Sequence, residues 1–227
     1  MMFVSHSEQG ANRLGEVANL FSLCAIFLLA ILNTLGVLEV DVHLVVPALL
    51  LETAIALPAV VISRATRRKA PCLRYLHLSA ALLLPTVVVA VDGFAYGMAF
   101  VIPIGLSCCY LDRKILWGTF ASILILLLVA AVANTCWGMP DVTMIDLPSD
   151  ALVPWRHDIE HVMEEIGYDR MIYLGNVLRF QYLPNVVFLV VCLILADGAM
   201  RAARTRAQMA DAFSKGLLDS IGKGCGA

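Results

Sequence analysis

The sequence has few charged residues, and this scarcity excludes most soluble folds. Only 15% of its 227 residues are Asp, Glu, Lys or Arg, whereas soluble domains have about 25%. Hydrophobic residues make up 60% of the chain, and the mean hydropathy is +0.84. A soluble fold of this composition would have too little polar surface to cover itself. The net charge of −2 gives no reason to expect nucleic acid as a partner.

Several motifs are also lacking. The seven cysteines include no C-x-x-C pair, their number is odd, and most lie in or beside apolar runs, so they are expected to be packing residues. The N-terminus has no basic n-region, and the first apolar run has no small-x-small cleavage site, so we expect this run to stay as a membrane span. Phosphate-binding loops, nucleophile elbows and haem motifs are absent. We therefore expect no cofactor, and an enzyme is not favoured.

The chain does contain six long apolar runs. They cover 17–38, 44–62, 73–91, 94–110, 115–137 and 183–200. A helix needs about 20 apolar residues to cross the hydrocarbon of a bilayer, and about 17 is the practical minimum. Lipid offers no hydrogen-bond partners to the backbone, so spans of this length must be helices. The sequence predicts an all-α fold, a polytopic transmembrane helical bundle with six spans.

The distribution of lysine and arginine predicts the orientation of this bundle. With six spans, thirteen of the sixteen basic residues fall on the side of the two termini, and only Arg156, Arg170 and Arg179 fall on the other side. The positive-inside rule places the basic side in the cytoplasm. We therefore expect a multi-pass protein of a bacterial inner membrane, in contact with the lipid bilayer, with both termini in the cytoplasm.

Two segments extend the bundle on opposite sides of the membrane. Residues 138–182 are expected to form an extracytoplasmic connection with an amphipathic helix, followed by a second short helix between Asp169 and Phe180. Residues 201–227 are expected to form a cytoplasmic tail, in which span six continues as a helix through Ile221. Small and apolar residues recur there in steps of four and three, which indicates a weak heptad seam and a possible homodimer through the tail.

Glu52 is the first candidate for a functional site, because it lies near the middle of the second apolar run. An ionised carboxylate at that depth costs several kcal/mol, so acids within spans often mark ligand, ion or proton sites. Asn33 in the first run is expected at a similar depth, where it could donate a hydrogen bond to Glu52. The alternative is a protonated glutamate that holds two helices together, worth about 1 kcal/mol.

A second and weaker candidate is a metal site on the amphipathic helix. His157, Glu160 and His161 match the H-x-x-E-H pattern of inverted zinc peptidases, and two histidines four residues apart share one helix face. A loop of this length cannot supply the substrate chamber of a peptidase. A metal-sensing site or an ordinary solvated helix face are the remaining interpretations.

The layout of the chain resembles the membrane sensor regions that precede bacterial histidine kinases, diguanylate or nucleotide cyclases and PP2C-type phosphatases. The residues that carry this resemblance are Arg201, Arg204 and Arg206 at the exit of span six, and the helix that continues through Ile221. The resemblance implies a sensor, input or anchoring module that relays a signal through span six. The recipient would be a separate cytoplasmic signalling protein or a missing output domain. The alternative is a small transporter or channel subunit that uses Glu52.

Overall fold

The structure is a computed structural model that describes residues 2–36, 42–68, 70, 72–92, 94–137 and 169–224. Within these ranges every regular element is a helix. The elements are α1 (Met2–Thr34), α2 (Val42–Ala65), α3 (Leu73–Asp92), the 3₁₀ helix η1 (Phe94–Phe100), α4 (Val101–Cys109), α5 (Arg113–Trp137), α7 (Arg170–Val177), the π-helix η4 (Leu178–Tyr182) and α8 (Leu183–Gly224). The predicted all-α fold is confirmed.

Four helical segments in the described part of the chain are long and apolar enough to cross a membrane. They are Glu8–Thr34, Leu73–Ala90, Arg113–Cys136 and Arg170–Gly216. The apolar helical segment Gly97–Cys109, which joins the end of η1 to α4, is shorter. These lengths support an integral membrane protein built from transmembrane helices.

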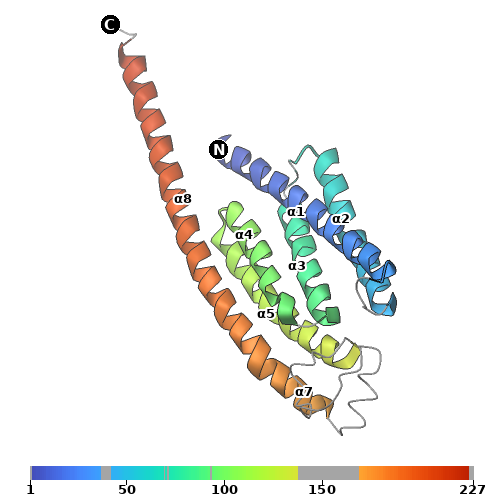
Figure 1. Cartoon of the computed structure of the whole chain (residues 1–227). Coiled ribbons are helices and arrows are strands. Elements are labelled where there is room, and N and C mark those ends of the chain that lie inside the picture. Colours follow the sequence, from blue (N-terminus) through green and yellow to red (C-terminus); the bar gives the residue numbers. More distant parts are fainter. Residues whose placement is uncertain are drawn as a thin grey trace.

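Successive long helices run in alternating directions through the bundle. Figure 1 shows α1, α2, α3, α4, α5 and α8 arranged in this way, so both ends of the chain lie at the same end of the molecule. The α2–α3 and α4–α5 turns lie at this end as well, whereas α7 lies at the opposite end. We call the end that holds the two termini the basic end, because Arg64, Arg74 and Arg113 flank its turns.

The largest apolar core lies between α3, α4, α5 and α8. Its buried members from these helices and from η1 and α7 include Val89, Phe100, Ile104, Leu116, Ile123, Leu127, Tyr173, Val177, Leu189 and Leu193. The part formed by α1, α2 and α3 has a smaller apolar cluster of Leu23, Ala56 and Ala80. Most of the buried polar residues lie in this second part: Asn12, Glu16, Asn19, Ser22, Glu52, Ser63 and His77. The α1–α3 part therefore encloses more of the buried polar groups of the described residues than the rest of the bundle does.

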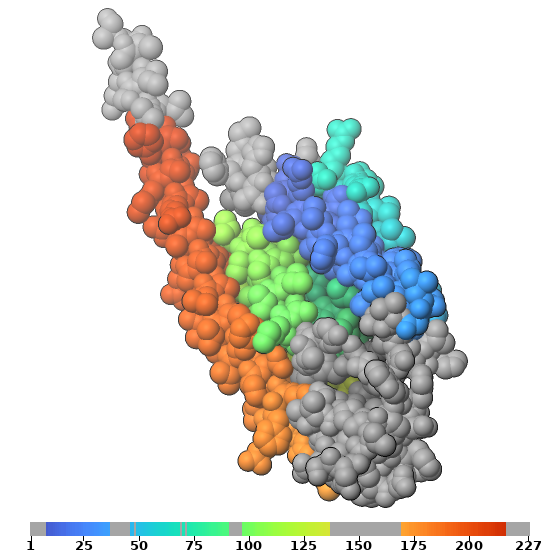
Figure 2. All heavy atoms as spheres, in the orientation of Figure 1, coloured from blue at the N-terminus to red at the C-terminus, as the bar shows by residue number. Residues whose placement is uncertain are grey.

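The helix α8 is the longest element, with 42 residues. At 1.5 Å per residue it extends for about 63 Å, roughly twice the thickness of the bilayer hydrocarbon. It follows α7 and the π-helix, and Asp169 caps α7 by accepting a hydrogen bond of 2.9 Å from the Met171 amide. The expected short helix after Asp169 and the helical tail beyond 201 are both present. Figure 2 shows the orange and red part of α8 leaving the side of the bundle, and Figure 1 shows the end of the helix beyond the other described helices.

Candidate functional site

Glu16 joins α1 to the end of α2 at the basic end of the bundle. Its side chain is 5% exposed, and its two carboxylate oxygens lie 2.8 Å from Arg64 Nε and 3.0 Å from Arg68 Nε. The Ser63 hydroxyl donates a third hydrogen bond, at 3.4 Å. Charge-assisted hydrogen bonds of this kind are stronger than neutral ones. The buried carboxylate is therefore compensated by two cations that keep contact with solvent.

The turn after α2 has an unusual backbone that α1 holds in place. Arg67 and Arg68 have φ angles of 49° and 61°, which are uncommon for residues other than glycine. The Arg68 amide donates to the Ser63 carbonyl at 2.8 Å, and the Asn12 side chain donates to the Arg68 carbonyl at 3.0 Å. This left-handed turn ends α2 and directs the Arg68 guanidinium back to Glu16.

Polar contacts continue from α1 to α3 and α4. Asn19 Nδ2 lies 2.9 Å from His77 Nδ1, and both residues are fully buried. The helices approach closely here, because a Cβ atom on Gly15 would lie 2.8 Å from His77 Cβ and Cγ. On the other side, the Tyr110 hydroxyl donates to Asn12 Oδ1 at 3.1 Å. Together with the Glu16 contacts, these form what we call the α1 polar network.

Glu52 lies outside this network, in the middle of α2. It is fully buried, and neither carboxyl oxygen has a hydrogen-bond partner among the described residues. It is 12 residues from Arg64, which corresponds to about 18 Å along the helix. Glu52 is thus buried within the bundle, as its position in the middle of an apolar run predicts. Its environment offers no compensating charge in the described part of the chain.

Asn33 is not brought to Glu52. Because α1 and α2 are antiparallel and pair Glu16 with Arg64 and Leu23 with Ala56, Glu52 is level with Phe27. Asn33 is six residues farther along α1, about 9 Å away from that level. The hydrogen bond that Asn33 could donate to Glu52 is not formed, because neither carboxyl oxygen of Glu52 has a partner among the described residues.

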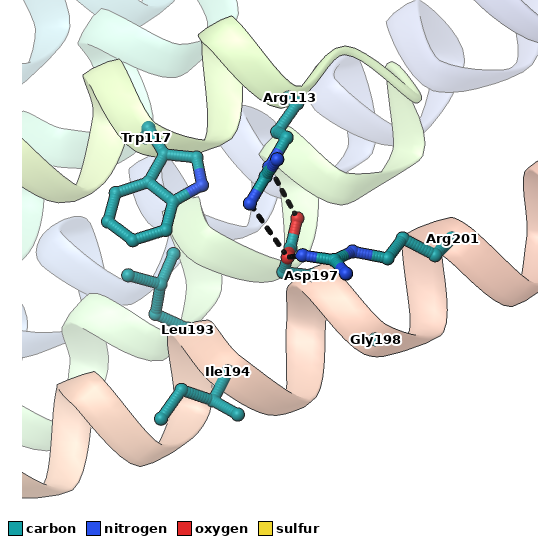
Figure 3. Close-up of a pocket in the computed structure, with 7 residues that line it drawn as sticks. All are labelled: Arg113, Trp117, Leu193, Ile194, Asp197, Gly198 and Arg201. Carbon is teal, nitrogen blue, oxygen red and sulfur yellow. Dashed lines mark hydrogen bonds and ion pairs between the residues drawn. The ribbon is translucent and has the colours of Figure 1, made fainter.

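A second charged cluster joins α8 to α5 where α8 leaves the bundle. Asp197 is 10% exposed, and its carboxylate lies 3.2 Å from Arg113 Nε and also contacts the Arg201 guanidinium on its own helix. One turn farther, Arg204 Nε donates to the Leu111 carbonyl at 2.8 Å. Figure 3 shows the two guanidinium groups converging on Asp197. We call this cluster of Arg113, Asp197 and Arg201 the α8 clasp.

Glu16 and the pairing of Arg113 with Asp197 were not predicted from the sequence. A signal for Glu16 was present: it directly precedes the first apolar run, and Arg64 follows the second. In an antiparallel hairpin those two ends meet. Asp197 is similarly the acid nearest to the end of the last run, with Arg201 four residues later. The pairing across to α5 depends on the tertiary packing and had no comparable signal.

The metal hypothesis falls on a part of the chain that the structure does not describe. His157, Glu160 and His161 lie within 138–168, outside the described residues. Among the residues that are described, no group of three or more His, Cys, Asp or Glu side chains is arranged to hold a metal ion.

Comparisons with known proteins add no family or function: no family model, curated protein or solved structure matches this chain.

Proposed function

We propose that this protein is a sensor, input or anchoring module of a bacterial inner membrane, with six spans and both termini in the cytoplasm. Two more crossings, by α2 and by η1 with α4, are consistent with the alternating directions of the helices (Figure 1). The distribution of basic residues supports the orientation, because thirteen of sixteen belong to the side of the termini.

The observation that carries the relay proposal is the continuity of α8. One helix reaches from the apolar core, at Leu189 and Leu193, to the exposed residues Met209 and Phe213 beyond the bundle. A rotation or shift of α8 within the bundle therefore moves the tail as well. The α8 clasp fixes one position of α8 against α5. A signal that favours a second position would bind the two states unequally and shift the populations between them.

The relay can be tested with a chimera in which a histidine-kinase catalytic domain follows residues 1–221 of this chain. Inserting one to four alanines after Met209 rotates the output about 100° per residue. Relay through a rigid helix predicts autophosphorylation that falls with one or two insertions and recovers with four, close to a full turn. The variant Asp197→Asn, which opens the clasp, should change the output of the chimera, whereas Arg206→Gln should not. The relay is contradicted if autophosphorylation is the same in all the alanine-insertion variants and in Asp197→Asn.

A small transporter or channel subunit is the second candidate, and Glu52 is the observation that favours it. A fully buried carboxyl with no hydrogen-bond partner among the described residues fits a site that takes up a proton or a cation. Proteoliposomes loaded with a pH-sensitive dye would reveal proton flux, and Glu52→Gln should abolish it. Equal flux through the wild type, Glu52→Gln and empty liposomes would remove this candidate.

A further inference from the structure

A groove between α5 and α8 lies beside the α8 clasp and has a volume of about 400 Å³. Its lining changes along α8. Leu193 and Ile194 are apolar, whereas Asp197 and Arg201, about one and two turns closer to the tail, are charged. Trp117 of α5 lines the groove at its apolar part (Figure 3). The groove thus has an apolar section followed by a charged section. This order matches a phospholipid, in which apolar acyl chains are followed by a charged headgroup.

The charged section carries an excess of positive charge. Two guanidinium cations, Arg113 and Arg201, share the single carboxylate of Asp197, which leaves a balance of one positive charge. The arginine side chains are 53% and 64% exposed, whereas Asp197 is 10% exposed. Each guanidinium has five N–H donors, and Asp197 on the buried side uses only part of them. The exposed edges therefore have donors for a second anion.

We propose that this groove binds one anionic phospholipid. Its phosphate oxygens accept hydrogen bonds from Arg113 and Arg201, and an acyl chain lies along the exposed side chains of Ile194 and Trp117. Basic pockets between transmembrane helices on the cytoplasmic side are suited to anionic headgroups, and the planar guanidinium matches two phosphate oxygens at once. Tryptophan favours the interface between the hydrocarbon and the headgroups.

The apolar section distinguishes a lipid from a free anion. Inorganic phosphate would use the two arginines but would leave Ile194 and Trp117 without a partner of matching chemistry. Ile194 is 64% exposed and Trp117 is 48% exposed, so both are available to an acyl chain. The lipid proposal depends on α5 and α8 crossing a membrane. It does not depend on whether the tail relays a signal.

Native mass spectrometry of the purified full chain can test the proposal by titration with phosphatidylglycerol and with zwitterionic phosphatidylcholine. We expect tighter binding of phosphatidylglycerol. Arg113→Gln and Arg201→Gln should each weaken it about fivefold, the effect of one basic residue near a membrane surface. Arg206→Gln serves as the matched control, because it removes the same charge five residues farther along α8. Its affinity for phosphatidylglycerol should stay close to that of the wild type.

Asp197→Asn gives a test in the opposite direction that retains both arginines. Removing the competing carboxylate should strengthen phosphatidylglycerol binding about fivefold. This gain in affinity cannot come from misfolding, so it also covers the case in which an arginine variant is unstable. Equal phosphatidylglycerol affinity in the wild type and in all three groove variants would overturn the proposal. It would also be overturned if inorganic phosphate showed the arginine dependence and phosphatidylglycerol did not.

Discussion

Two buried glutamates on neighbouring helices have opposite surroundings. Glu16, at the basic end of α1, contacts Arg64, Arg68 and Ser63. Glu52, in the middle of α2, is enclosed as completely but has no hydrogen-bond partner for either oxygen within the described ranges. The same side chain is thus compensated at the end of the bundle and uncompensated at its centre.

The difference follows from where cations can be placed. Arginines that end a span keep their guanidinium groups near water, as the 63% and 39% exposure of Arg64 and Arg68 indicates. At the depth of Glu52 an arginine would itself be costly. An acid at the end of a span therefore serves structure at little cost. An acid at the centre adds no stability unless it has a ligand or a proton, which is why Glu52 remains the candidate for function.

The largest expected effect comes from removing the two acids one at a time. Glu16→Ala should lower the free energy of unfolding by about 3 kcal/mol, because two charge-assisted hydrogen bonds are lost and the arginines are only partly solvated. Glu52→Leu should leave stability unchanged or raise it by about 1 kcal/mol, because a buried polar group without a partner is replaced by an apolar one. Reversible unfolding in detergent micelles, followed by circular dichroism, measures both.

Glu16→Gln and Glu52→Gln are the matched controls, since they keep the shape and remove the charge. Glu16→Gln should lower the free energy of unfolding by less than Glu16→Ala does. Glu52→Gln should have the same free energy of unfolding as the wild type. A loss of about 1 kcal/mol or more in Glu52→Leu would mean that Glu52 holds the helices together through interhelical polar contacts, and the contrast between the two acids would disappear.

The contrast also shows how far a sequence of this kind can be interpreted. The helical fold and the burial of Glu52 could be predicted, because long apolar runs and one acid inside them are visible without any partner. The position of Asn33 relative to Glu52 could not, because a shift of six residues between antiparallel helices leaves no trace in either run. The α1 polar network depends on the same register. It also depends on the turn at Arg67 and Arg68. Both residues have a left-handed backbone, and because neither is glycine, the sequence gives no sign of this turn.

The next effect concerns the close approach that brings α1 to α3. Gly15→Ala should destabilise the protein by about 2 kcal/mol, because the added Cβ would lie 2.8 Å from His77 Cβ and Cγ and must displace α3. Gly10→Ala on the same helix is the control, since a Cβ there meets nothing within 4 Å. It should be neutral or slightly stabilising, because alanine favours helices. Equal unfolding curves for the two variants would contradict a tight α1–α3 contact.

The smallest expected effect tests whether the compensation of Glu16 extends to α4. Tyr110→Phe removes the hydroxyl that donates to Asn12 Oδ1 and should cost about 1 kcal/mol. Tyr75→Phe is the control, because Tyr75 is 56% exposed. Asn12 also holds the Arg68 carbonyl, so Tyr110 and Glu16 act on the same turn from two sides.

A double-mutant cycle between Glu16→Ala and Tyr110→Phe decides whether they form one unit. If the turn at Arg68 connects them, the two losses will fall short of additivity by about 0.5 kcal/mol or more. Once Glu16 no longer holds Arg68, the turn is less ordered. The hydrogen bond between Tyr110 and Asn12 then stabilises the folded state less, so its loss costs less. Strict additivity would separate Tyr110 from the network. The compensation of Glu16 would then be confined to the α1–α2 pair.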